Sequence, residues 1–288
     1  MMRRPGRRTF IAALAAALAA GAAQGQVQLV PQTPPPEAEL RLAATFGADP
    51  APITSGLRWR IYAAAGSEPQ LIQESQEAAP AFVLPPGEYV AHVAYGYASN
   101  SKRLTVRRGI NTDRLSISAG GLVIKASIAD QPIAPGRLSL AVYIPAPGNS
   151  EDKLVTSAVK SDELLRLPEG TYHVVSVYGD TNSIVRADIA VRSGKVTVAT
   201  MLHKAATITL KLVTRAGGEA IANTAWTVLT PGGDVIREAI GAFPTIALAE
   251  GVYTAIARNA GNAYTSEFKI VSGLDRDIEV LAQDPQPR

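Results

Sequence analysis

Hydrophobic and polar positions alternate along most of the chain in short runs that are separated by turn residues. In the run 57–62, Leu57, Trp59 and Ile61 fall on one face and two arginines fall on the other. A period of two is typical of half-buried β-strands, and turns at intervals of about 8 to 12 residues are typical of β-sandwiches. The pattern therefore predicts an all-β chain.

One phrase, Leu-x-x-Gly-x-Tyr, occurs three times, and each copy leads into an alternating run. The tyrosines lie 83 residues apart (89 to 172) and then 81 (172 to 253), a period long enough for each repeat to have its own core. We expect the leucine to end a strand inside the core and the glycine to permit a tight bend. The tyrosine ring should pack inward and bond upstream backbone through its hydroxyl, as in a tyrosine corner. The phrase residues are Leu84, Gly87, Tyr89, Leu167, Gly170, Tyr172, Leu248, Gly251 and Tyr253.

The repeat predicts three tandem antiparallel β-sandwich domains of an Ig-like or prealbumin-like kind, at residues 40–119, 120–205 and 206–283. Residues 284–288 form a loose tail. Trp59 and Trp226 occupy equivalent inward positions in their repeats, so we expect both rings in the core.

The N-terminus has the pattern of an export signal. Residues 1–25 combine a basic start, an apolar alanine-rich stretch and small residues for cleavage, and residues 26–39 form a proline-rich linker. Arg7-Arg8 resembles a twin-arginine motif, and an ordinary general-secretion signal is the alternative. We expect a periplasmic or secreted protein.

Charge and composition then exclude several classes of function. Without residues 1–25 the chain holds 24 Lys and Arg against 25 Asp and Glu, a net charge of −1, and it shows no basic stripe for nucleic acid. No later segment is long and apolar enough to predict a transmembrane helix. The absence of cysteine excludes disulfides, thiolate metal sites and cysteine catalysis.

The three phrases, each followed by an alternating strand and then Val-x-x-Gly or Ile-x-x-Gly, resemble carboxypeptidase regulatory-like and prealbumin-like sandwich modules. The closing motifs are Val106 to Gly109, Val191 to Gly194 and Ile270 to Gly273. Cna-B-like and PEGA-like surface repeats share the pattern. The resemblance implies non-catalytic modules of envelope or extracellular proteins that act as spacers or binding surfaces.

Candidate metal and catalytic residues are few. His92, His173 and His203 are isolated and lack metal-binding spacing, so we expect them on strand faces or near strand ends. No nucleophile motif or phosphate-binding loop is present, and we expect no cofactor.

Three acids, Asp275, Asp277 and Glu279, alternate along one predicted strand. They indicate either a calcium site or the charges that protect an exposed edge strand from aggregation.

Tyrosines near two strand ends provide the one candidate binding feature. Tyr95, Tyr97 and Tyr178 fall at the same loop end of successive repeats, where sandwiches often bind ligands. Exposed tyrosine rings there would stack on sugars.

These features predict a non-enzymatic scaffold or adaptor that binds a protein partner in the envelope of a Gram-negative bacterium. A module that binds peptidoglycan or another polysaccharide is the alternative, and an unrecognised hydrolase is the second alternative.

Overall fold

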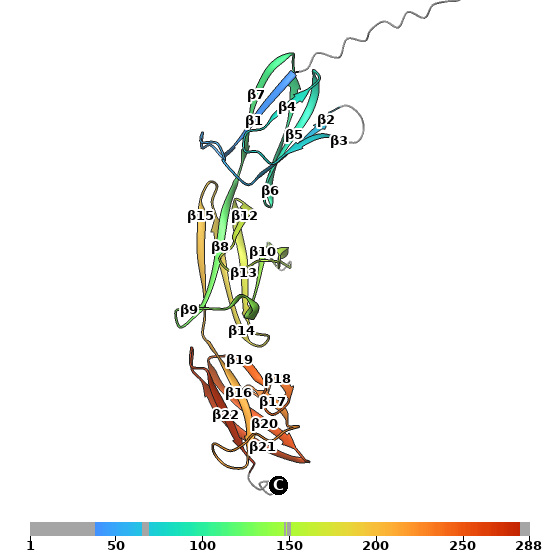
Figure 1. The fold of residues 1–288 in the computed structure, drawn as a ribbon. Helices are drawn as coiled ribbons and strands as arrows, with labels where there is room; N and C mark the ends of the chain where they lie inside the picture. The colour runs from blue at the N-terminus through green and yellow to red at the C-terminus, as the bar shows by residue number, and fades with distance from the viewer. Residues whose placement is uncertain (1–37, 65–68, 147, 149–150, 283–288) are drawn as a thin grey trace, which may run out of the picture. The chain divides into compact units, whose positions relative to one another are not determined.

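The computed structural model describes residues 38–64, 69–146, 148 and 151–282, most of which lie in β-strands (Figure 1). The predicted signal peptide 1–25 and tail 284–288 lie outside the described residues, as does the linker 26–39 except for its last two residues. The first strand begins at Ala38, and the all-β prediction is confirmed.

We call β1–β7 the first module. Its strands are β1 (Ala38–Phe46), β2 (Leu57–Ala63), β3 (Gln70–Ser75), β4 (Ala81–Leu84), β5 (Gly87–Tyr95), β6 (Ala98–Val106) and β7 (Gly109–Ile117).

The second module is β8–β15 and contains one short 3-10 helix. Its elements are β8 (Ala119–Ile128), β9 (Gln131–Pro132), η1 (Pro135–Arg137), β10 (Leu138–Ile144), β11 (Lys153–Thr156), β12 (Leu164–Pro168), β13 (Gly170–Tyr178), β14 (Ser183–Val191) and β15 (Val196–His203).

The third module is β16–β22. Its strands are β16 (Ala205–Val213), β17 (Ala225–Leu229), β18 (Val235–Ile240), β19 (Thr245–Ala249), β20 (Gly251–Asn259), β21 (Asn262–Ile270) and β22 (Arg276–Leu281).

All three modules repeat one sheet topology. One sheet has the order β4-β1-β7, β12-β8-β15 or β19-β16-β22, and in the second module the two-residue strand β9 also pairs with β8. It faces a four-stranded sheet of order β3-β2-β5-β6, β11-β10-β13-β14 or β18-β17-β20-β21. The sandwich class is therefore confirmed. The strands are not all antiparallel, because the first and last strands of every module pair in parallel. That pairing needs a crossover, which the other strands provide by passing through the opposite sheet.

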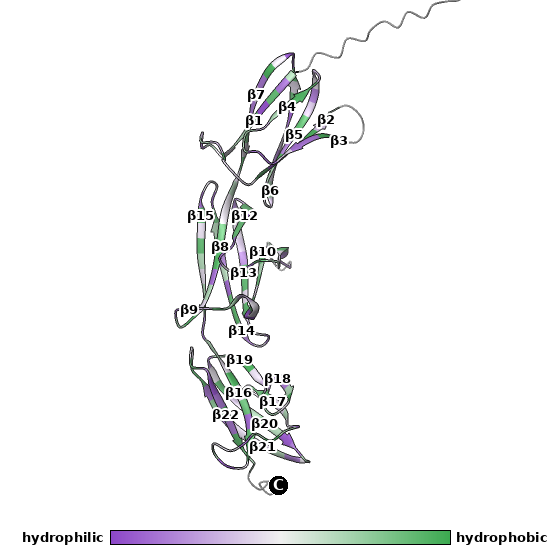
Figure 2. Ribbon diagram, in the orientation of Figure 1, coloured by the Kyte–Doolittle hydropathy of each residue, from purple (hydrophilic) through white to green (hydrophobic). Residues whose placement is uncertain are grey.

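A separate hydrophobic core lies between the two sheets of each module, built from the inward residues of alternating strands. Trp59 and Trp226 are both fully buried, in the first and third cores. The alternation of apolar and polar residues that defines these cores is visible along the strands in Figure 2. The domain boundaries stay a prediction, since the described strands all belong to one unit that begins at Pro36.

The repeated phrase forms the same corner in every module. The tyrosine is buried, and its hydroxyl donates to the backbone carbonyl four residues upstream: Tyr89 to Pro85 at 2.9 Å, Tyr172 to Pro168 at 2.8 Å and Tyr253 to Ala249 at 2.9 Å. Burial raises the pKa of the Tyr89 and Tyr172 hydroxyls, so they stay protonated donors.

In the first two modules the glycine of the phrase does not make the tight bend that the sequence predicts, whereas Gly251 of the third has a φ of +159°. Gly87 and Gly170 start strands β5 and β13 without a left-handed backbone, so no tight bend depends on them. A Cβ at either position would lie 3.6 to 3.9 Å from the ring of the following tyrosine, which is ordinary contact. Left-handed glycines lie in other turns, and two of them, Gly96 and Gly179, contact the neighbouring module.

Candidate interaction site

The candidate binding tyrosines lie at two turns, and each turn packs against the neighbouring module. The first joins β5 to β6 and contains Tyr95, Gly96 and Tyr97. The second joins β13 to β14 and contains Tyr178 and Gly179. Both glycines have a left-handed backbone, with φ of +62° and +71°.

The turn of the first module packs on Arg166 of β12. The amide of Tyr97 donates to the Arg166 carbonyl at 3.0 Å, and the Arg166 guanidinium lies over the Tyr95 ring, 5.1 Å from its centroid. A Cβ at Gly96 would come within 2.6 Å of the Arg166 carbonyl oxygen, so only glycine fits. Phe46 closes the contact edge-on to Tyr95, with the ring centroids 5.2 Å apart.

The turn of the second module packs on β19 and β16 in the same way. The Tyr178 hydroxyl bonds to the Thr207 hydroxyl at 2.8 Å, and the Arg137 guanidinium, which bonds the same Thr207 oxygen, lies 4.8 Å from the Tyr178 centroid. Ala247 of the third module joins the core of the second. A Cβ at Gly179 would lie 2.7 Å from the Ala247 Cβ.

Asn182 completes this second joint. Its side-chain nitrogen donates to the Tyr253 hydroxyl at 2.8 Å, and its oxygen accepts the Ala249 amide at 3.0 Å. The corner tyrosine of the third module is therefore shared between two modules. Arg237 and Asp180 add an exposed ion pair at 2.6 Å.

These contacts correct the prediction of exposed tyrosines at both loop ends. Tyr178 is only 4% exposed, because the third module covers it, and Tyr95 is half-buried beneath Arg166. Tyr97 alone keeps an open ring, at 52% exposure. The structure thus leaves one of the three candidate rings free to stack on a sugar.

A shallow groove lies beside Tyr97. Its volume is about 230 Å³, and more apolar than polar surface faces it. The lining residues are Tyr97, Ile144, Lys153, Leu154, Val155, Pro168 and Tyr172. The groove combines an exposed ring, aliphatic side chains and one ammonium group, which suits an apolar peptide side chain better than a sugar rich in hydroxyls.

A buried polar cluster in the second module was not recognised from the sequence. His203 Nε2 lies 2.7 Å from the Ser176 hydroxyl, and His203 Nδ1 lies 2.9 Å from the Ser183 hydroxyl. Burial lowers the pKa of His203, so the ring is neutral and donates to one serine while it accepts from the other. Of these three side chains, none is more than 3% exposed.

The geometry of this cluster resembles that of a base and a nucleophile, but it gives no route to a substrate and no carboxylate to orient the ring. A comparison of the repeats could have found this cluster, because its three polar residues stand where the first module has apolar ones. The registers of the paired strands match Ser176 with Val93, Ser183 with Ala98 and His203 with Ile117.

The other two histidines lie on the four-stranded sheets. His173 contacts Asp188 at 2.8 Å. His92 is partly buried, and its pKa is lowered by burial and by the nearby Arg60.

The three acids of β22 and its preceding turn each have a separate partner. Asp275 accepts the Thr207 amide, Asp277 bonds the Lys211 ammonium, and Glu279 accepts the amide of Gly217. Across the part of the chain that the structure describes, no three His, Asp or Glu side chains come together as a metal site. The three acids are therefore not brought together around one point, and their interpretation as edge-strand charge stays a prediction.

Fold and site together define a tandem β-sandwich protein whose candidate interaction surfaces are sheet edges and one groove. Residues 207–282 match the model of a protein family described as the Rhizobiales growth-associated tandem repeat domain. Comparison with curated proteins gives no match. Within residues 38–64, 69–146, 148 and 151–282, no helix is long and apolar enough to cross a membrane.

Several solved structures are similar to the chain. The Bacillus anthracis TIE protein is 15% identical over 86% of this chain and 50% of that one, with a TM-score of 0.25. A streptococcal ancillary pilin is 11% identical over 88% and 100%, with a TM-score of 0.32. BcpA, the major pilin subunit of Bacillus cereus, is 9% identical over 86% and 100%, with a TM-score of 0.23. The chain spans half the length of the TIE protein. At these TM-scores the likenesses carry no argument about function.

Proposed function

We propose that this protein is a non-catalytic scaffold of the bacterial envelope that holds a protein partner. The supporting observation is the use of the loop ends. Turns that often bind ligands in single sandwiches here join one module to the next, through Gly96 on Arg166 and Gly179 on Ala247. Such joints fix successive modules to one another, which is what a spacer or adaptor needs.

The groove beside Tyr97 is the proposed contact for the partner. It lies between the turn of the first module and the edge strand β11, and its aliphatic lining has an open backbone edge beside it. An extended peptide can add to such an edge and place an apolar side chain in the groove. The growth-associated description of the family that matches residues 207–282 favours a partner from the machinery of envelope growth.

The test is site-specific photocrosslinking in the parent bacterium. A photoreactive residue at Leu154, in the groove, should capture one envelope protein reproducibly. The same residue at Val252, an exposed position on β20, is the matched control and should not capture it.

Two outcomes would overturn the proposal. Co-sedimentation with peptidoglycan that is lost in Tyr97→Ala would support glycan binding instead. Turnover of an ester, glycoside or peptide substrate by the purified protein would support a hydrolase.

A further inference from the structure

The second module differs from its neighbours along one side of the sandwich. On that side β15 ends the sheet β12-β8-β15 and β14 ends the sheet β11-β10-β13-β14, so both strands have one unpaired backbone edge among the described elements. The matching strands are β6 and β7 in the first module and β21 and β22 in the third. Free edges of this kind associate with other strands unless charge or covering prevents it.

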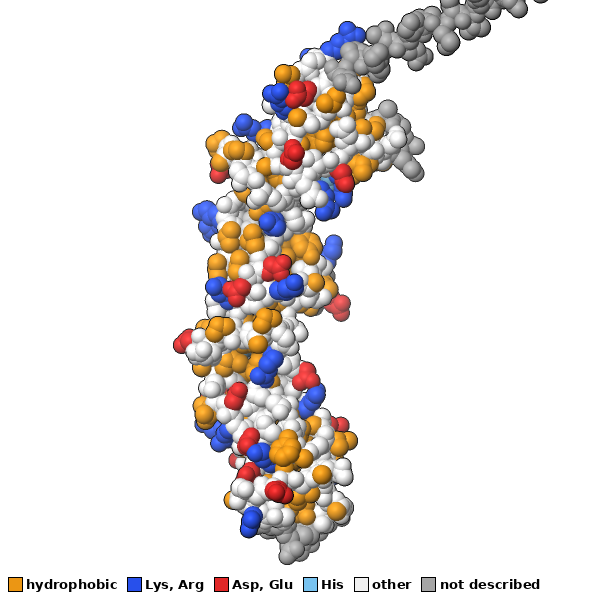
Figure 3. All heavy atoms as spheres, in the orientation of Figure 1, with side chains coloured by type: hydrophobic (Ala, Val, Ile, Leu, Met, Phe, Trp, Pro, Cys, Tyr) orange, Lys and Arg blue, Asp and Glu red, His pale blue; other side chains and the backbone are white. Residues whose placement is uncertain are grey.

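The outward side chains of β15 carry no charge. Val196, Val198 and Leu202 are 60%, 58% and 62% exposed, and Thr200 lies between them. At the level of Val198 the apolar surface continues across the sheet, because Val198 pairs with Val123 and Val123 pairs with Leu164. Beside Thr200 it is interrupted by Lys125 of β8. The space-filling view shows hydrophobic side chains over the second module with Lys, Arg, Asp and Glu side chains between them (Figure 3).

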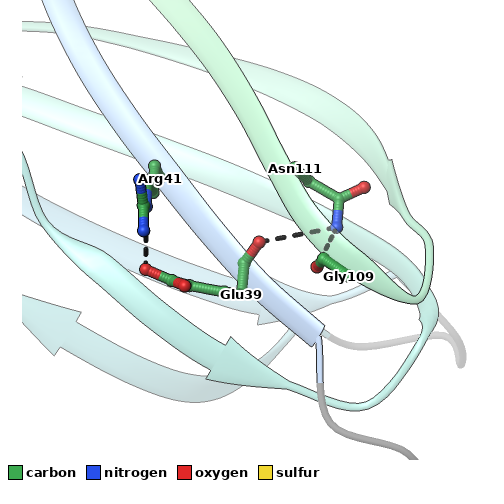
Figure 4. Close-up of polar contacts among 4 residues, drawn as sticks. All are labelled: Glu39, Arg41, Gly109 and Asn111. Carbon is green, nitrogen blue, oxygen red and sulfur yellow. Dashed lines mark hydrogen bonds and ion pairs between the residues drawn. The ribbon is translucent and has the colours of Figure 1, made fainter.

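The equivalent strands of the other two modules carry charge in the same row. Arg114 of β7 and Glu279 of β22 occupy the position of Thr200, and Asp277 occupies that of Val198. The central strands do not make this difference, because β1 carries the ion pair of Glu39 and Arg41 and β8 carries Lys125, which pairs with Asp162. On the edge strand of the first module, Asn111 of β7 bonds back to the Glu39 carbonyl (Figure 4). Hydrophilic residues accordingly colour much of β22 but little of β15 in Figure 2.

We propose that the second module self-associates, with a second copy of this chain pairing along β14 and β15 about one two-fold axis. When this axis is perpendicular to the sheets, β14 pairs with β14 of the second copy and β15 pairs with β15 of the second copy, both antiparallel. A bond from the Thr197 hydroxyl to the Ala190 carbonyl, at 3.1 Å, fixes the relative level of the two strands. Because the strands run in opposite directions, Thr200 then lies level with Ala187.

An axis at that level gives favourable pairs in both sheets. On β14, Arg186 lies opposite Asp188 of the second copy, and the reciprocal pair forms on the other side of the axis. On β15, Thr200 lies opposite Thr200 and Val198 opposite Leu202. Opposite charges and β-branched or aliphatic pairs are the cross-strand neighbours that stabilise antiparallel sheets. In free chains Asp188 contacts His173, and the pairing adds Arg186 to that carboxylate.

The same arrangement is unfavourable in the other modules. It would place Arg114 opposite Arg114 in the first module and Glu279 opposite Glu279 in the third, and like charges directly opposite are destabilising. The edge contact is thus specific to the second module. It does not depend on the partner in the proposed function, because it uses a different side of the sandwich from the groove.

A single cysteine tests the register, because the chain has no cysteine of its own. Thr200→Cys should form a disulfide-linked dimer rapidly under a mild oxidant, since directly opposed residues of an antiparallel pair have Cα atoms within disulfide range. Arg114→Cys and Glu279→Cys are the matched controls and should stay monomeric. Mixed Val198→Cys and Leu202→Cys chains should cross-link with each other faster than either does alone.

Charge reversal tests the affinity by sedimentation equilibrium of the full chain. Arg186→Asp places two carboxylates opposite each other at both symmetric positions and should weaken the dimer by roughly tenfold or more. Arg186→Asp with Asp188→Arg restores both pairs and should restore the dimer. Thr265→Asp, at the equivalent position of β21, should change nothing. A chain that stays monomeric with Thr200→Cys cross-linking no faster than the controls would overturn the proposal, and so would failure of the double reversal to restore a dimer.

Discussion

The first and second modules share strand order, sheet pairing and the tyrosine corner, yet one end of their cores is built from different chemistry. In the first module matched positions hold only apolar side chains, whereas in the second they hold a histidine between two serines. The matched pairs are Val93 and Ser176, Ala98 and Ser183, and Ile117 and His203. Both ends are buried. The difference teaches that a polar side chain can replace an apolar one at this end of the core when its hydrogen-bonding partners are buried with it. In the second module both ring nitrogens of the histidine have a serine hydroxyl as partner.

Placing a histidine at the matching position of the first module should lower the free energy of unfolding more than any other substitution discussed below. In Ile117→His the imidazole would be buried among Val93 and Ala98 with no hydrogen-bond partner from either. We expect the free energy of unfolding to fall by about 3 to 5 kcal/mol, from the lost aliphatic packing and the unsatisfied ring. Hydrogen exchange in β7 measures the effect locally.

The reverse exchange is its control. Replacing Ser176, Ser183 and His203 together by Val, Ala and Ile transfers the apolar set to the second module and should leave stability within about 1 kcal/mol of the native chain. A large loss in this triple variant would show that the cluster has a role beyond satisfying itself.

A pH titration should distinguish the same two core ends. Burial holds the pKa of His203 below its ordinary value of 6.5, so the unfolded chain takes up a proton that the folded chain refuses. The stability of the second module should therefore be constant above that value and fall as the pH drops through it toward the lower folded pKa. The groups against the ring are Ser176, Ser183 and Tyr178.

The triple variant that removes the histidine should lose this pH dependence. His92, whose pKa is also lowered, gives the first module a response of the same sign, so the comparison requires module-resolved hydrogen exchange at each pH. Equal slopes in the native and triple-variant second modules would contradict the prediction.

Features that recur in every repeat, the strands and the tyrosine corner, could be predicted from the sequence. Features that depend on contacts between distant residues could not. Alternation predicted the strands, and the recurring phrase predicted a tyrosine that bonds upstream backbone, because both follow from local pattern. Tyr178 was misjudged as exposed since its burial depends on Ala247 and Thr207, about 30 to 70 residues later in the chain. The parallel pairing of first and last strands was likewise beyond a local pattern.

Two glycines, one in the corner phrase and one at the second joint, provide the next comparison. At Gly179 alanine would need φ of +71° and would bring its Cβ 2.7 Å from that of Ala247, so we expect a loss of about 1 to 3 kcal/mol. At Gly170 the backbone is ordinary and the nearest atom, in the Tyr172 ring, lies 3.9 Å away. Gly170→Ala should then change stability by less than about 0.5 kcal/mol, as thermal unfolding would show.

Adding Ala247→Gly to Gly179→Ala separates the two causes. It removes the steric clash but leaves the backbone strain, so it should recover part of the loss. Ala247→Gly alone is the reference, because Ala247 is a buried residue of β19 and glycine there costs about 0.5 to 1 kcal/mol by itself. Relative to that reference, full recovery would mean that the left-handed backbone costs nothing, and no recovery would mean that the joint does not form as described.

The second joint contains partly buried hydrogen bonds of Asn182 and one exposed ion pair, and the ion pair should have the smallest effect on stability. Asn182 makes two hydrogen bonds there, to the Tyr253 hydroxyl and the Ala249 amide, and both are partly buried. Asn182→Ala should cost about 1 to 2 kcal/mol, because it leaves the Ala249 amide without its acceptor.

Arg237 and Asp180 also join the modules, but their side chains are 41% and 66% exposed, so water already solvates both charges. Arg237→Ala should therefore cost less than about 0.5 kcal/mol, and even that should vanish at high salt. Chemical denaturation at low and high ionic strength measures both, and a salt-independent loss in Arg237→Ala would mean that its aliphatic stem, not its charge, holds the joint.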